Sequence, residues 1–306
     1  IEGGGLGVFR PEEIGPSEVQ ARNGVIDVLV DDEAAAVRAA RHYLSFFQGR
    51  VSEWDWADSS ALREAVPENR VRAYDVRTVM RGVADAGSLL ELREGFGRSV
   101  LTALARIEGR PVGLLASNPG HLGGAIDADA ADKAARFVQL CDVHGLPIVS
   151  LIDTPGFLVG PQAEAQAQVR HVSRLFLAAA RKRVPWLAVV LRKAYGLGAM
   201  ALAGGSLHAP MATAAWPTGE FGAMGLEGAV RLGYRKELEA QPEGPAREAL
   251  FERLLAEQVA RGAALNIAQT LEIDAVIDPA DTRDWLARGL ASAKVGEPGG
   301  RYVDAW

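Results

Sequence analysis

Apolar runs of strand length alternate with amphipathic segments of helix length over most of the chain. The runs rich in β-branched residues predict buried strands at 99–107, 111–117, 147–152 and 184–191. Apolar positions at helical spacing predict helices at 127–144, 164–181, 246–261 and 282–294. Because strands and helices alternate, the pattern predicts an α/β domain built from βαβ units.

The first 72 residues follow a different pattern. Residues 25–30 have the apolar content of a short strand, and Asp31, Asp32 and Glu33 can cap a helix that runs to about Gln48. Residues 51–72 show neither period, with two tryptophans among charged residues and a proline. This stretch is therefore interpreted as a linker between residues 1–50 and the α/β domain.

A glycine-rich turn follows the apolar run 184–191 and has the most distinctive chemistry of the chain. It reads Arg-Lys-Ala-Tyr-Gly-Leu-Gly-Ala-Met over residues 192–200 and leads into a small-residue segment, 198–205, that can form a helix. The first turn of a helix leaves backbone N–H groups without intrahelical partners, and these can hold an anion or a developing oxyanion. No side chain here is a nucleophile, so any catalysis would use the backbone.

Three interpretations of this turn compete. It can be a tight packing turn, since glycine is common at turns. It can be a dinucleotide site, since Gly196-x-Gly198-x-x-Ala201 fits the G-x-G-x-x-G/A fingerprint, with Glu220 downstream. It can be an oxyanion hole. The dinucleotide interpretation is disfavoured because the turn follows the fourth clear strand and because Glu220 is predicted to lie in a loop.

Composition excludes several classes of protein. The 306 residues carry a net charge of −6 and no long basic run, which argues against a nucleic-acid partner. No apolar run is long enough for a membrane span, and no signal peptide is visible. The single cysteine, Cys141, lies in a helical apolar pattern and is predicted to be buried, which fits a reducing, cytoplasmic compartment. The five histidines show no metal-ligand spacing, so no metal site is predicted.

A set of short motifs occurs in a specific order. They are 117–127 (SNPGHLGGAID), 133–138 (KAARFV), 141–142 (CD), 153–157 (DTPGF), 192–196 (RKAYG), 215–218 (AWPT) and 224–229 (MGLEGA). Over about residues 73–295, this order resembles the C-terminal half of the carboxyltransferase β subunits of biotin-dependent acyl-CoA carboxylases. The chain begins at Ile1 without an initiator methionine, and we expect it to be a fragment of a longer polypeptide.

The resemblance implies a crotonase-like fold, a ββα superhelix, in subunits that carry two such domains, six of which assemble as a dimer-based hexamer, a trimer of dimers. Residues 1–50 would be the tail of the N-terminal domain, 51–72 a linker, 73–295 the C-terminal, carboxybiotin-side domain, and 296–306 a tail. The implied partners are acyl-CoA, a biotin carboxyl carrier and a biotin carboxylase. Since no Ala-Met-Lys-Met biotinylation sequence occurs, biotin would be carried on a separate domain or subunit. In a eukaryote the location would be the mitochondrial matrix.

The resemblance also implies site residues. Gly198 and Ala199 match the backbone pair that binds the biotin ureido oxygen, although this sequence has Leu197 as one extra residue before them. The expected cofactor-binding residues are Asp153, Thr154, Pro155, Gly156, Phe157, Tyr195 and Gly196. The expected substrate-binding residues are Gly123, Gly124 and Ala201, the last of which is hypothesised to shape the acyl pocket. For the loop residues, a structural turn is the alternative interpretation.

The implied reaction is carboxyl transfer from carboxybiotin to the α-carbon of an acyl-CoA. Two alternatives stay open. A biotin-dependent acyl-CoA decarboxylase of the same fold runs the same chemistry in reverse, and an isolated domain can have a non-catalytic role in assembly. The sequence does not give the acyl chain, because half of the acyl pocket would lie in another domain.

Overall fold

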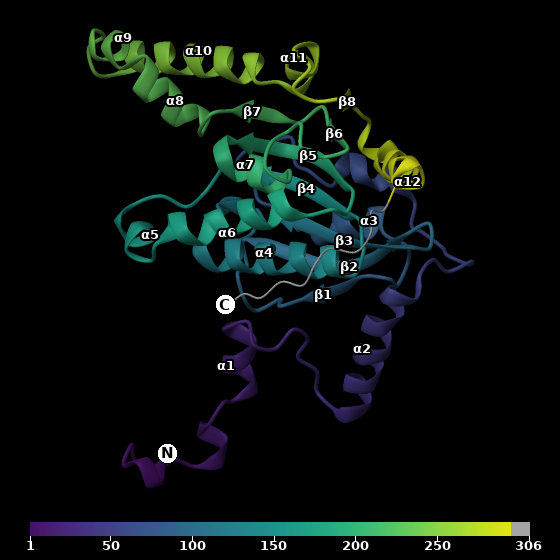
Figure 1. Ribbon diagram of the computed structural model, residues 1–306. Helices are drawn as coiled ribbons and strands as arrows, with labels where there is room; N and C mark the ends of the chain where they lie inside the picture. The colour runs from purple at the N-terminus through teal and green to yellow at the C-terminus, as the bar shows by residue number, and fades with distance from the viewer. Residues whose placement is uncertain (295–306) are drawn as a thin grey trace.

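One mixed sheet runs through the molecule, with helices on both of its faces (Figure 1). The computed structural model describes residues 1–294. The described strands are β1 (Leu90–Leu92), β2 (Val100–Ile107), β3 (Arg110–Ser117), β4 (Ile148–Thr154), β5 (Trp186–Tyr195), β6 (Ala212–Ala215), β7 (Glu220–Gly222) and β8 (Ala275–Val276). The spatial order is β1-β2-β3-β4-β5-β6-β8, and β7 pairs with the end of β5. The hairpin β1-β2-β3 is antiparallel, and the strands from β3 onward pair in parallel.

Helices connect the strands and form an arm beyond them. The α-helices are α1 (Ser17–Arg22), α2 (Glu33–Ser45), α3 (Arg77–Val83), α4 (Ala128–Val143), α5 (Pro161–Ala165), α6 (Gln168–Arg181), α7 (Gly196–Leu202), α8 (Leu226–Gly233), α9 (Arg235–Glu239), α10 (Pro245–Arg261), α11 (Ala264–Gln269) and α12 (Thr282–Ser292). The 3-10 helices are η1 (Glu2–Gly4), η2 (Pro11–Glu13), η3 (Phe46–Gln48), η4 (Ser59–Glu64), η5 (Leu122–Gly124) and η6 (Pro279–Asp281). Figure 1 shows α8, α9 and α10 projecting from one edge of the sheet, and α1 at the opposite end of the molecule.

Alternate strand residues fill two cores, one on each face of the sheet. In β2, Leu104 packs into the core under α4 and α6, whereas Leu101 packs into the core under α3 and α12. Every residue of β2 and of β4 is buried. Both faces of a parallel α/β sheet are covered by helices, so its strands are apolar throughout, as the sequence pattern predicted. Cys141 of α4 is fully buried, as predicted, and burial raises the pKa of its thiol.

Most of the predicted strands and helices are confirmed, and the differences have local causes. The predicted strand at 25–30 is wrong, because the segment joins no strand of the described sheet and the N–H groups of Val25 and Ile26 bond to Gln20 O instead. The predicted helix 164–181 is interrupted at Ala167, whose φ of 56° separates α5 from α6. β5 extends to Tyr195, four residues beyond the prediction, because its end pairs with β7.

The segment interpreted as a linker packs against the sheet domain. Val51 N donates to Gly109 O at the β2–β3 turn, and Leu62 of η4 is buried in the core under α3. Arg63 forms an ion pair of 2.9 Å with Asp278 beside η6. The domain boundaries at 50 and 72 stay a prediction. None of the described helices is long and apolar enough to cross a membrane.

Candidate active site

The turn between β5 and α7 requires glycine. Gly196 has a φ of 56°, in the left-handed region, and a Cβ at this position would lie 2.8 Å from Ala223 O. The strand therefore turns directly into α7, two residues earlier than the sequence predicted. This turn fixes where the first backbone N–H groups of the helix lie.

Gly198 brings the predicted biotin-side loop against the start of α7. A Cβ on Gly198 would lie 2.7 Å from both Cα and C of Gly156, and 3.0 Å from the backbone N of Phe157. Real side chains do not approach backbone atoms this closely, so only glycine permits the contact. Gly156 and Gly198, which are 42 positions apart in the chain, thus pack directly against each other.

The third predicted loop joins the same cluster through Gly124. Thr154 Oγ1 donates to Gly124 O at 2.7 Å, and Gly156 N donates to Thr154 Oγ1 at 3.1 Å. A Cβ on Gly124, which has a φ of 84°, would lie 2.5 Å from Asp153 O. Gly123 also has a positive φ but faces open space. The strand-end loops after β3 and β4 and the start of α7 therefore form one compact site.

Asp153 and Arg192 form a buried ion pair beneath this site. Arg192 Nε and Nη2 each lie 3.0 Å from Asp153 Oδ2, and Lys193 N donates to Asp153 Oδ1 at 3.1 Å. Arg192 also donates to Arg72 O at 2.8 Å. Burial raises the pKa of the neighbouring Tyr74 hydroxyl, which keeps that hydroxyl protonated. Because these contacts occupy the carboxylate, Asp153 supports the loop rather than presenting a free acid.

A second polar group holds the side chain of Tyr195 immediately before α7. Tyr195 OH donates to Glu220 Oε2 at 3.1 Å, and Arg70 Nη2 reaches the same oxygen at 2.7 Å. Arg70 Nη1 donates to Glu227 of α8 at 2.7 Å. Burial raises the pKa of Tyr195, and the hydrogen bonds to Glu220 raise that of Arg70. The network of Arg70, Tyr195, Glu220 and Glu227 will be called the Tyr195 clamp.

The Tyr195 clamp was not predicted from the sequence. Glu220 was expected in a loop, yet it lies in β7 and its carboxylate is engaged by Arg70 and Tyr195. It is therefore not free to bind a ribose, which further disfavours the dinucleotide interpretation. Arg70 comes from the segment interpreted as a linker, and nothing in the sequence indicated its partners. The only sequence feature that pointed to this network was the presence of Glu227 in the motif at 224–229.

A cavity of about 220 Å³ adjoins α7 and is mostly apolar. Gly196, Ala199 and Met200 form one side of it, and Phe221 and Ile267 lie among its other lining residues. Ala201 is fully buried in the core and does not line this cavity, whereas Met200 is 38% exposed. The hypothesis that Ala201 shapes an acyl pocket stays a prediction. Met200, the residue before it, is one of the residues that line the cavity.

The residue at which α7 begins determines which of its backbone N–H groups lack a partner within the helix. Gly196, Leu197 and Gly198 are its first three residues, so their N–H groups have no carbonyl partner within the helix. Ala199 is the fourth residue, and its N–H is the first that can reach the carbonyl before the helix. Leu197 is 62% exposed, whereas Gly198 and Ala199 are buried. The N–H groups without a partner inside the helix are therefore those of Gly196, Leu197 and Gly198.

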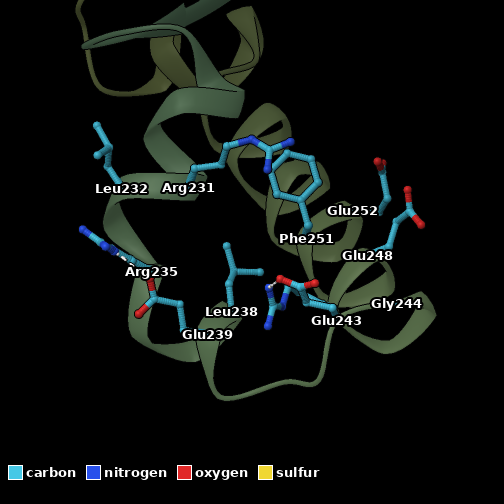
Figure 2. A pocket seen from close by; sticks show the side chains of 11 residues that line it. Arg231, Leu232, Arg235, Leu238, Glu239, Glu243, Gly244, Glu248, Phe251 and Glu252 are labelled. Carbon is cyan, nitrogen blue, oxygen red and sulfur yellow. Dashed lines mark hydrogen bonds and ion pairs between the residues drawn. The ribbon is translucent and has the colours of Figure 1, made fainter.

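A larger groove, of about 620 Å³, lies on the arm formed by α8, α9 and α10 (Figure 2). Its charged side chains largely neutralise one another: Arg235 pairs with Glu239 at 2.7 Å, and Arg247 pairs with Glu243 at 3.3 Å. The Arg231 guanidinium lies 4.4 Å from the centre of the Phe251 ring. None of the lining residues belongs to α7 or to the strand-end loops. The groove is therefore separate from the site described above.

The fold and the site define a class of α/β domain in which a parallel strand delivers a helix N-terminus onto two strand-end loops. Residues 8–297 match the carboxyl transferase domain family. The chain therefore belongs to that family, and the expected resemblance is confirmed.

Relatives of known function share this family. The chain is 38% identical, over 91% of its length and 54% of the relative's, to the methylmalonyl-CoA carboxyltransferase 12S subunit of Propionibacterium freudenreichii. It is 35% identical to the propionyl-CoA carboxylase carboxyltransferase subunit of Haloferax mediterranei, over 89% of its length and 54% of the relative's. The chain thus spans about half the length of these relatives.

Solved structures agree with the fold. The transcarboxylase 12S hexamer, determined with methylmalonyl-coenzyme A bound, superposes with a TM-score of 0.85 at 33% identity, covering 99% of this chain and 60% of that one. A single-chain, multi-domain long-chain acyl-CoA carboxylase superposes with a TM-score of 0.88 at 55% identity, covering 94% of this chain and 28% of that one. Transcarboxylase 12S is built from crotonase-fold domains, so the expected crotonase-like fold is confirmed.

Proposed function

We propose that this chain forms the carboxybiotin-side half of an acyl-CoA carboxyltransferase, an enzyme that transfers a carboxyl group to the α-carbon of an acyl-CoA. The observation that carries the proposal is the junction of α7 with the 153–157 loop. There, Gly198 contacts the Gly156 backbone, the first three N–H groups of α7 have no partner within the helix, and Gly196 and Ala199 on either side of the proposed donors line a cavity. Family membership supports the reaction class.

Backbone N–H groups are the groups that this chain contributes to the chemistry. Gly198 N–H is one proposed donor, as the sequence predicted. The helix numbering favours Leu197 N–H as the second, because the Ala199 N–H can bond within the helix. Two donors held rigidly by a packed helix would stabilise negative charge on a bound oxygen without having to reorganise. No side-chain nucleophile is required for this role.

The residues around α7 fit biotin. A mostly apolar cavity beside Ala199 suits a fused ring, and the donors suit the oxygen of a urea. Carboxybiotin, delivered by another domain or subunit, would supply the carboxyl group that is transferred. Gly196, Gly156 and Phe157 would shape the approach to the donors, whereas Asp153, Thr154 and Tyr195 would hold the loops and the helix in place. Pro155, Gly123 and Gly124 are proposed to line the same approach.

The rest of the enzyme is proposed by analogy with the relatives. Residues 1–50 would be the end of the N-terminal domain, which would hold the acyl-CoA, and the subunits would assemble as a hexamer. A biotin carboxyl carrier and a biotin carboxylase would complete the system. The 55% identity to a long-chain acyl-CoA carboxylase favours a long acyl chain as substrate over a short one.

The test is an assay of the reverse partial reaction in the full-length protein that carries this chain. We expect decarboxylation of malonyl-CoA, methylmalonyl-CoA or a long-chain 2-carboxyacyl-CoA that depends on added free biotin. The long-chain compound is expected to give the highest kcat/KM. Decarboxylation that proceeds equally well without biotin, or no turnover of any of the three, would contradict the proposed function.

A further inference from the structure

Lys133 is a buried lysine that the proposed reaction does not use. It belongs to α4, within the KAARFV motif, and is only 2% exposed. Its ammonium donates to Phe96 O at 2.9 Å, and it has no ion pair among residues 1–294. Burying a charged ammonium is costly unless nearby negative or polar groups offset the lost hydration, so the charged groups around Lys133 matter.

The carboxylates around Lys133 are occupied by arginines. Glu91 accepts two hydrogen bonds of 2.7 Å from Arg77. Glu94 lies 3.3 Å from the same guanidinium. On the other side, Asp27 accepts a hydrogen bond of 2.8 Å from Arg93. Glu91 and Glu94 thus share the Arg77 guanidinium, and none of these three carboxylates forms an ion pair with the Lys133 ammonium within residues 1–294.

A separate cavity of about 130 Å³ lies against this lysine. Lys133, Arg136 and Arg93 line it, together with the hydroxyl-bearing Tyr43 and Thr102, and Asp27 is its only acidic lining residue. Arg136 is exposed and has no ion pair within the described part of the chain. Desolvation lowers the pKa of Lys133 to about 8, and the nearby Glu91 carboxylate offsets only part of this effect.

We propose that this cavity binds a small oxyanion of the phosphate class, with Lys133 and Arg136 as its cationic ligands. The cavity is large enough for a tetrahedral anion, and its lining carries three cations, Lys133, Arg93 and Arg136, against the single carboxylate of Asp27, so a dianion would balance the charge. Charge-assisted hydrogen bonds from both would supply the affinity. Asp27 and Tyr43 lie before residue 51 and Lys133 lies in the α/β domain, so the bound anion would tie these two parts of the chain together. This site is independent of the proposed function.

The experiment titrates the full-length protein with inorganic phosphate by calorimetry at pH 7, with chloride holding the ionic strength constant. Sulfate is a second free anion, and phenyl phosphate represents a phosphate group on a larger molecule. We expect saturable binding of one phosphate per chain. The affinity should fall at least about tenfold in Lys133→Met and about threefold in Arg136→Gln. It should be unchanged in Arg253→Gln, a matched change at an exposed arginine of α10.

Binding of phenyl phosphate with similar affinity would support a phosphate group of a larger ligand, and binding of inorganic phosphate alone would support a free anion. Two results would overturn the site: heats that do not saturate beyond the chloride baseline, or an affinity that Arg136→Gln and Lys133→Met leave unchanged. Because Arg136 is exposed, its variant keeps the test decisive even if Lys133→Met folds poorly.

Discussion

At the scale of single residues, Gly198 permits the contact with Gly156 and is also one of the two proposed backbone donors. Gly198→Ala keeps the N–H but places a Cβ 2.7 Å from the Gly156 backbone. We expect it to lower stability by about 1–3 kcal/mol and to lower kcat at least about tenfold, because the loop must move. The measurements are the free energy of unfolding and the biotin-dependent decarboxylation rate.

Gly228→Ala in α8 is the matched control for this prediction. A Cβ at Gly228 would meet nothing within 4 Å, so the substitution should stabilise the helix by up to about 1 kcal/mol and leave kcat unchanged. If Gly198→Ala behaved like Gly228→Ala, the close contact between α7 and the 153–157 loop would have no functional meaning.

The buried charge of Lys133 predicts a pH dependence of stability. Its pKa is about 8 in the folded protein, against 10.5 ordinarily, so the folded state releases this proton first as the pH rises. The cost of burying the ammonium, about 3 kcal/mol, is therefore fully present below pH 8 and is relieved between pH 8 and 10.5. In phosphate-free buffer, wild type should gain stability relative to Lys133→Met as the pH rises from 7 to 10. Parallel pH profiles of the two unfolding free energies would contradict this.

At the scale of elements, the Tyr195 clamp connects the end of β5 to the helical arm. Tyr195→Phe removes the hydrogen bond donated to Glu220 and a longer one accepted from Arg70, and should cost about 1 kcal/mol. Arg70→Met leaves the largely buried Glu220 carboxylate without its cation and should cost about 3 kcal/mol or more. We expect kcat to fall in both variants, in the same order, because α7 loses its support. Chemical denaturation and the decarboxylation assay measure the two effects. Equal stability losses would show that Arg70 and Glu220 do not act as a pair.

Sequence patterns predicted the elements whose burial decides their structure. The strands β2 to β5 and the helices α4 and α10 follow from apolar runs and helical spacing, since burial dominates their energetics. The contact of Gly198 with Gly156 was not predictable from spacing, because it depends on how three loops meet at the ends of neighbouring strands. β7 has three residues and no apolar run of its own, so its pairing with Lys193–Tyr195, and with it the true length of β5, could not be seen.

The residue at which α7 begins could also not be predicted from the sequence. Small residues at 196–205 are compatible with a helix beginning at Gly196 or at Gly198, and only the backbone at Gly196 decides between them. Similarly, the motif around Asp153 could be read as a ligand site or a turn. The structure assigns its carboxylate to Arg192, which a spacing of 39 residues does not reveal.

At the scale of the whole molecule, the chain holds one half of the proposed enzyme. It spans 54% of the 12S relative, and Phe9, Ile14 and Val25 near its start are at least half exposed. We expect the isolated chain to fold, because its sheet has a core on each face, but to show no biotin-dependent decarboxylation. Circular dichroism and the same assay, run beside the full-length protein, check this. Turnover by the isolated chain at the full-length rate would show that the acyl-CoA site is contained within it.

The most direct test of the central claim, that backbone donors at the start of α7 perform the chemistry, compares Leu197→Pro with Leu197→Ala in the full-length protein. Proline removes the N–H of residue 197, is tolerated in the first turn of a helix and replaces an exposed side chain, whereas Gly198→Pro would also collide with Gly156. We predict that biotin-dependent decarboxylation falls about 100-fold or more in Leu197→Pro and stays near wild type in Leu197→Ala. Near-wild-type turnover by a folded Leu197→Pro would contradict the assignment of this donor and favour the Gly198 and Ala199 pair.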